Sequence, residues 1–161
     1  MSAFGGDWRY LSREGDSSLV NIQTFTVPDR EVWQVLSLWV EYTAGTDIAT
    51  RQIRVQIRDD TDDVMMELAP GVTVTASQTR FFHMYPGAAD LTAARDTDYI
   101  STPIPAGLLL RPQWDLEVVE ESSASTINAA GASDDNMTVQ LMYAKQSVLT
   151  TDGATPFTSD N

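Results

Sequence analysis

Four carboxylates stand close together in the sequence RDDTDDV, which is the densest group of potential metal ligands in the chain. Asp59, Asp60, Asp62 and Asp63 could bind Ca²⁺, a hard cation that takes oxygen ligands. The segment lacks the central glycine and the distant glutamate of the helical calcium-binding loop. The alternative is a solvated turn whose charges discourage pairing with another sheet edge. Only the first interpretation predicts that thermal stability rises with added Ca²⁺.

The sequence contains no recognisable combination of catalytic residues. Asp115 and Glu117 share a strand face, but they alternate with an apolar face and are therefore expected to point to solvent rather than into a glycosidase cleft. His83 is the only histidine, so it cannot supply the several ligands of a zinc or cupin-type site, and no serine or cysteine elbow lies near it. We therefore expect no enzyme, no cofactor and no catalytic metal centre.

The charge and composition of the chain limit the kinds of partner that it is expected to bind. The 161 residues contain 23 Asp and Glu against 10 Lys and Arg, which gives a net charge of −13, and there is no cysteine. Such an acidic surface repels phosphate backbones, so nucleic acid is not expected as a partner. The chain contains neither a secretory signal pattern nor an apolar stretch long enough to span a membrane. The charge either keeps the protein soluble or complements a basic surface.

Short runs with alternating apolar and polar residues, separated by Pro, Gly, Asp and Asn, dominate the chain and predict β-strands. In Arg51–Asp59, for example, Ile53, Val55 and Ile57 share one face and are expected inside. No window shows a helical period. We expect an all-β fold, a single jelly-roll-like antiparallel β-sandwich of about eight strands, with an immunoglobulin-like sandwich as the main rival. The strand-like runs behind this expectation, some of them short, are 18–26, 31–43, 51–59, 64–68, 72–75, 80–85, 99–104, 108–111, 113–120 and 137–144.

The same runs divide the chain into an N-terminal arm (residues 1–17), a β-sandwich domain (18–146) and a polar C-terminal tail (147–161). The arm carries Phe4, Trp8 and Tyr10, which are too hydrophobic for a simple disordered segment. An exposed aromatic cluster usually marks an interface, so we expect these residues to dock on a neighbouring chain. In the alternative, the arm folds back on its own sandwich as an extra edge strand.

Three arginines, Arg51, Arg54 and Arg58, form a basic patch in an otherwise acidic chain. Arg54 and Arg58 fall on one strand face. They either pair with acids of their own chain or contact an acidic partner surface, where arginine is favoured.

Four segments, VPDREVWQVLSLWVEYT, AGTDIATRQIRVQIRD, IPAGLLLRPQWDLEVVE and DDNMTVQLMYAK, together resemble the small jelly-roll virion proteins of tailed bacteriophages, in particular capsid decoration (cement) proteins. The resemblance covers residues 24 to 145 and lies in strand and turn patterns, best in the Pro-Ala-Gly turn and the last strand. It carries over no catalytic motif.

What the resemblance implies is a homotrimer, made in the host cytoplasm, that sits on the outside of the expanded head and bridges neighbouring major capsid proteins. An outward Trp33 or Trp39 would anchor its interface, and Trp39 adds apolar bulk to the face expected to be exposed. The alternatives are a tail or head-fibre component, or a carbohydrate-binding module of the virion.

Overall fold

The computed structural model describes residues 9–14, 22–46, 48–89, 98–122 and 135–148, and within them every element of regular secondary structure is a β-strand. No helix in this part of the chain has the length and apolarity needed to cross a membrane. The strands are β1 (Arg9–Glu14), β2 (Ile22–Thr26), β3 (Glu31–Thr43), β4 (Arg51–Arg58), β5 (Val64–Leu68), β6 (Thr73–Val74), β7 (Thr79–Pro86), β8 (Tyr99–Ile104), β9 (Leu109–Leu110), β10 (Asp115–Ser122) and β11 (Asn136–Ser147).

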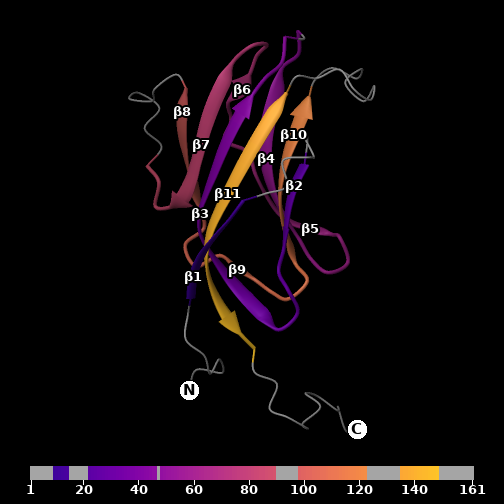
Figure 1. Cartoon of the computed structure of the whole chain (residues 1–161), viewed down its shortest axis with the longest axis vertical. Helices are drawn as coiled ribbons and strands as arrows, with labels where there is room; N and C mark the ends of the chain where they lie inside the picture. Colours follow the sequence, from indigo (N-terminus) through magenta and orange to yellow (C-terminus); the bar gives the residue numbers. More distant parts are fainter. Residues whose placement is uncertain (1–8, 15–21, 47, 90–97, 123–134, 149–161) are drawn as a thin grey trace, which may run out of the picture.

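Two sheets pack face to face in an elongated sandwich (Figure 1). One has the order β1-β11-β3-β7-β8, with β9 also paired to β3, and the other has the order β2-β10-β4-β5, with β6 paired to β4. Their pairings nest from the ends of the chain inward: β1 with β11, β2 with β10, β3 with β7 and β4 with β5, all antiparallel. This nested order is the jelly roll, so the predicted fold class is confirmed. The pairing of β8 to β7 is parallel.

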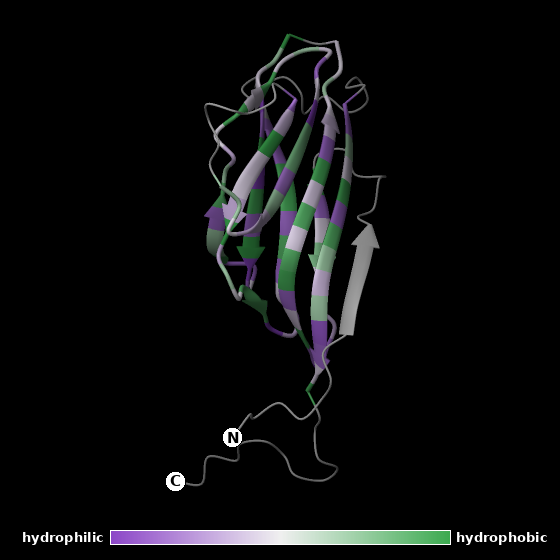
Figure 2. Ribbon diagram, turned by 90° about the vertical axis from the view of Figure 1, so that its left-hand side faces the viewer, coloured by the Kyte–Doolittle hydropathy of each residue, from purple (hydrophilic) through white to green (hydrophobic). Residues whose placement is uncertain are grey.

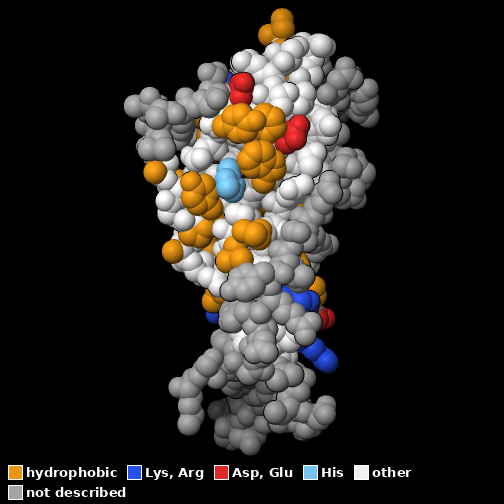
Figure 3. Space-filling view, turned by 60° about the vertical axis from the view of Figure 1, so that its left-hand side comes forward, with side chains coloured by type: hydrophobic (Ala, Val, Ile, Leu, Met, Phe, Trp, Pro, Cys, Tyr) orange, Lys and Arg blue, Asp and Glu red, His pale blue; other side chains and the backbone are white. Residues whose placement is uncertain are grey.

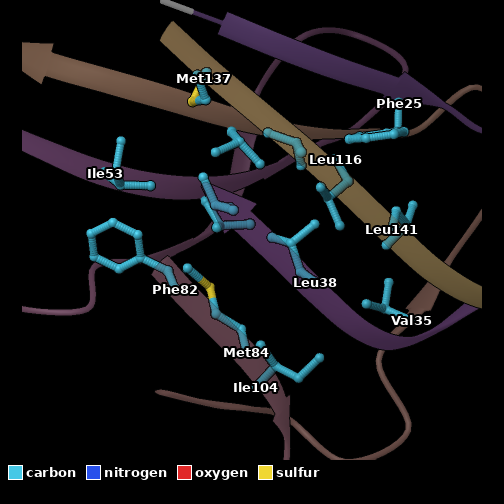
Figure 4. Packing of buried hydrophobic residues seen from close by; sticks show 14 of the residues in the cluster. Phe25, Val35, Leu38, Ile53, Phe82, Met84, Ile104, Leu116, Met137 and Leu141 are labelled. Atoms are coloured by element: carbon cyan, nitrogen blue, oxygen red, sulfur yellow. The ribbon is translucent and has the colours of Figure 1, made fainter. Parts of the chain in front are cut away.

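Alternation of side chains along the strands builds the core. Purple and green residues alternate along most strands in Figure 2, as a half-buried sheet requires. In β4 the burial alternates without a break, and Ile53, Val55 and Ile57 are inside as predicted. Figure 4 shows side chains of both sheets meeting, among them Phe82 of β7 and Leu116 of β10.

The prediction that Trp33 faces outward is wrong. Trp33 is 1% exposed, stacks on Tyr143 with ring centroids 4.1 Å apart, and donates its indole N–H to Glu31 over 2.8 Å. The cause is a β-bulge between β3 and β11, where the register shifts and Leu36 and Ser37 together face Met142. The extra residue in β3 changes which positions face the core. Before the bulge the odd-numbered Trp33 and Val35 point inward, and after it the odd-numbered Trp39 points outward.

The segment expected to be an irregular arm contributes a strand. Arg9–Glu14 pairs along its whole length with β11, from Arg9 opposite Lys145 to Glu14 opposite Gln140. For these residues the structure has the alternative arrangement, an edge strand of the chain's own sandwich. Tyr10 lies in this strand opposite Ala144, whereas Phe4 and Trp8 lie outside the described residues.

Candidate functional site: an aromatic sheet face

Five aromatic side chains gather on the outer face of the larger sheet, and we call this group the aromatic face: Trp39, Phe81, His83, Tyr85 and Tyr99. Three neighbouring strands supply them, because register places Trp39 of β3 opposite His83 of β7, and Phe81 of β7 opposite Tyr99 of β8. Their inward-facing neighbours Val40, Phe82, Met84 and Ile100 are buried in the core. Alternation therefore forces the five rings to the outside.

The rings contact one another across the strands. Phe81 and Tyr99 stack with centroids 4.7 Å apart and planes 15° from parallel. Trp39 lies 5.6 Å from Phe81, 5.7 Å from His83 and 6.4 Å from Tyr99, and His83 lies 4.7 Å from Tyr85. These separations fall in the range at which aromatic pairs stabilise each other beyond simple burial. Figure 3 shows apolar side chains gathered in several patches around the single histidine on this side of the molecule.

Much of this area is open to solvent. Tyr99 is 53% exposed and the other four rings are partly exposed. Met142 of β11, 46% exposed, extends the apolar surface toward the bulge, since it faces Ser37 of β3. A contiguous apolar area of this kind on a sheet face marks an interaction surface more often than a solvated one, and Trp and Tyr are the residues that anchor interfaces.

The charges beside the aromatic face are negative. Glu41, opposite Phe81 in the sheet, is exposed, and so is Asp98, the residue before β8. The described outward side chains at residues 37–41, 81–85, 99–103 and 138–142 include no Lys or Arg. Among these described residues, the surface around the aromatic face is thus apolar or uncharged polar, with Glu41 and Asp98 at one end.

Among the predicted interface residues whose side chains the structure describes, Trp39 is therefore the one that lies in an exposed aromatic group. Sequence reasoning missed Phe81, Tyr85 and Tyr99 as members of the group and treated His83 as an isolated residue. The available signal was the run FFHMY, whose first, third and fifth residues, Phe81, His83 and Tyr85, share a strand face.

The other sheet has an ionic outer face. Arg54 pairs with Glu67 over 2.7 Å and also with Glu121, and Arg58 pairs with Glu117 over 2.8 Å and with Asp62 over 3.1 Å. Burial lowers the pKa of Arg58, but the neighbouring Glu117 and Asp62 carboxylates outweigh it and the net pKa is raised. Both predicted arginines thus have acidic partners within their own chain, and Asp115 and Glu117 lie on this outer face as expected.

Arg51 does not belong to a surface patch, and the prediction that placed it there is wrong. It shares the inward parity of Ile53, is 0% exposed, and donates from Nε to Asp135 over 2.8 Å. Asp135 also accepts a hydrogen bond from the backbone N–H of Gly45. The buried pair thereby connects β4, the loop after β3 and the start of β11 at one end of the sandwich.

Two further ionisable groups face this buried pair. Burial raises the pKa of Glu120 of β10, and the Asp135 charge adds to the rise while Arg51 opposes it. Burial likewise raises the pKa of Tyr42 of β3, with smaller contributions from Glu120 and Asp135. A protonated Glu120 and a neutral Tyr42 are the states that such surroundings favour.

The aspartate loop folds as a turn closed on itself. The Oδ1 atom of Asp59 accepts hydrogen bonds from the backbone and hydroxyl of Thr61 (2.9 and 2.8 Å) and from the backbone N–H of Asp63 (3.0 Å). The Thr61 hydroxyl is the main cause of a lowered pKa of Asp59. Within the described residues no group of three or more acidic, His or Cys side chains is placed to hold a metal ion.

Comparison with known proteins adds little. No family model and no curated protein matches the sequence. Among solved structures, one titled "Structure of infectious bursal disease virus Gx strain" is similar, with 9% identity and a TM-score of 0.29 over 93% of this chain and 32% of that chain. The chain thus spans about a third of the length of its structural match, and a TM-score this low carries no argument about fold or function.

Proposed function

We propose that this chain is a structural virion protein that binds the outside of a bacteriophage capsid and cements neighbouring major capsid proteins. The observation that carries the proposal is the aromatic face, the partly exposed cluster of Trp39, Phe81, His83, Tyr85 and Tyr99. On the outer face of the other sheet, by contrast, Arg54 and Arg58 pair with acids of the same chain. The sequence resemblance to decoration proteins and the jelly-roll order of the strands support it.

The physical mechanism is linkage. A protein that binds the assembled shell and not its separated subunits shifts the equilibrium toward the shell by mass action. Several weak contacts per oligomer add through effective concentration, because the second contact is intramolecular once the first has formed. Burying Trp39 and Tyr99 against the shell would supply apolar area without any chemistry at the surface.

A homotrimer is part of the proposal, since a closed ring over a threefold junction presents three identical contact faces at once. Sedimentation equilibrium of the isolated protein measures this directly. A mass three times that of the 17.7 kDa chain supports the trimer, and a monomer at micromolar concentration contradicts it.

The cementing role is tested by co-sedimentation of the purified protein with expanded heads that lack it, with bound copies counted per capsid. Saturable binding near a multiple of the lattice's threefold positions is expected. Trp39→Ala should weaken binding, while Met65→Ala, which removes a 57% exposed side chain from β5 in the other sheet, should not. Heads that retain no protein would end the proposal.

The second candidate is a carbohydrate-binding module of a tail or head fibre. It is favoured by one observation, the partial exposure of Trp39, Tyr85 and Tyr99, because aromatic rings stack on sugars. Glycan-dependent retention of the isolated protein that is lost in Tyr99→Ala, together with no binding to heads, would select it.

A further inference from the structure

The acids of the two sheets differ in how they are used. Glu67, Glu117 and Glu121 on the ionic face each pair with an arginine of the same chain. Glu41, on the outer surface of the larger sheet beside Phe81, is exposed and makes no ion pair with any described residue. Its charge is therefore available to a partner.

We propose that the aromatic face receives arginine side chains of the partner protein; this deepens the proposed function and rests on it. A guanidinium group stacks on aromatic rings and pairs with carboxylates through a planar fork of donors. One arginine side chain can therefore contact both the rings of the aromatic face and the Glu41 carboxylate. Arginine is also the charged residue enriched at protein interfaces. Lysine carries the same charge but is more strongly hydrated and has no planar surface to stack.

Charge complementarity argues against a second copy of this chain as the occupant. A symmetric contact of one aromatic face on another would place the Glu41 carboxylates of both copies around the same apolar area. A basic partner surface is the better match for a protein of net charge −13.

His83 gives a direct assay, because it is the only histidine and lies inside the aromatic face, 5.7 Å from Trp39 and 4.7 Å from Tyr85. Its ring proton resonances are a single set in an NMR spectrum of the unmodified protein. The isolated protein is titrated at physiological salt with acetyl-Gly-Arg-Gly-amide, and with the Lys and Gln versions of the same peptide. We expect a saturable shift with the Arg peptide, a weaker response to Lys and none to Gln.

Matched variants separate this site from general attraction to an acidic surface. Glu41→Gln and Tyr99→Ala should each weaken Arg-peptide binding about two- to fivefold, the range of one exposed cation–π or ion-pair contact. Asp60→Asn removes one exposed charge from the aspartate loop, and Met65→Ala removes one exposed side chain from the other sheet. Both controls should bind the Arg peptide as the unmodified protein does.

Three results would overturn the inference: equal responses to the Arg and Gln peptides, no response to any peptide, or an effect of Asp60→Asn as large as that of Glu41→Gln. A response to maltohexaose without one to the Arg peptide would also overturn it, and would point to a glycan site. Binding to heads through Trp39 with no Arg-peptide response refutes the inference alone. An Arg-peptide response without binding to heads refutes the proposed function alone.

Discussion

The buried pair of Arg51 and Asp135 offers the sharpest test of the fold. Both side chains are 0% exposed, and their ionic contact is 2.8 Å long. Asp135→Ala would remove the carboxylate that pairs with the buried Arg51 guanidinium and that accepts the Gly45 N–H. Removing one partner of a buried ion pair costs about 3–5 kcal/mol, because the remaining charge has lost its solvation and gained nothing in exchange.

For a chain of this length each kcal/mol lowers the Tm by about 2–4 °C, so we expect Asp135→Ala to melt about 6–20 °C below the unmodified protein in a calorimetric scan. Glu117→Gln is the control, since it breaks the Arg58 pair on the outer face, where the side chains are 24% and 17% exposed. A surface pair of this kind contributes about 0.2–1 kcal/mol, which corresponds to a few degrees at most.

A second substitution tests the cause. Arg51→Met in the Asp135→Ala background removes the uncompensated charge, so the double variant should be more stable than Asp135→Ala alone. The reasoning is refuted if Asp135→Ala costs no more than Glu117→Gln. It is also refuted if adding Arg51→Met to Asp135→Ala lowers the stability as much as Arg51→Met lowers that of the unmodified protein.

Three further outcomes follow from the described contacts. Burial raises the folded-state pKa of Glu120 above its unfolded value of 4.5. The contribution of Glu120 to the free energy of unfolding therefore falls as the pH rises from 4.5 through the folded-state pKa. Glu120→Gln should raise the Tm at pH 7 and change it little at pH 4. Phe82→Ala, at a 0% exposed core position, should cost about 3–5 kcal/mol in denaturant unfolding, whereas Met65→Ala should stay within about 0.5 kcal/mol. Millimolar Ca²⁺ should leave the Tm unchanged, because Oδ1 of Asp59 already accepts three hydrogen bonds within its turn; a rise that a chelator reverses would contradict this.

The strands could be predicted from the sequence because period-two alternation is a local signal. Ile53, Val55 and Ile57 are buried on alternate positions of β4, and Met137, Val139 and Leu141 on those of β11. Trp33 could not be placed the same way, because the bulge that reverses its parity is set by pairing between β3 and β11, roughly a hundred residues apart in the chain.

The other features that the sequence did not predict depend on which strands pair and on which charged residues meet. Trp39, Phe81 and Tyr99 each have the right parity in their own strands, but only the order β3-β7-β8 brings the three rings together. Arg51 carries the inward parity of Ile53, yet its tolerance inside the core depends on Asp135, which is 84 positions away in the chain. Away from a bulge, side-chain parity is local information, whereas the identity of a cross-strand or buried charge partner is not.

We propose that the aromatic face attaches this protein to a capsid. Its most direct test is co-sedimentation of Trp39→Ala, Met65→Ala and the unmodified protein with heads that lack the chain, after circular dichroism has shown that all three are folded. We expect equal saturable binding for the unmodified protein and Met65→Ala, and reduced occupancy for Trp39→Ala. Binding that Trp39→Ala leaves unchanged, or no binding by any of the three, would contradict it.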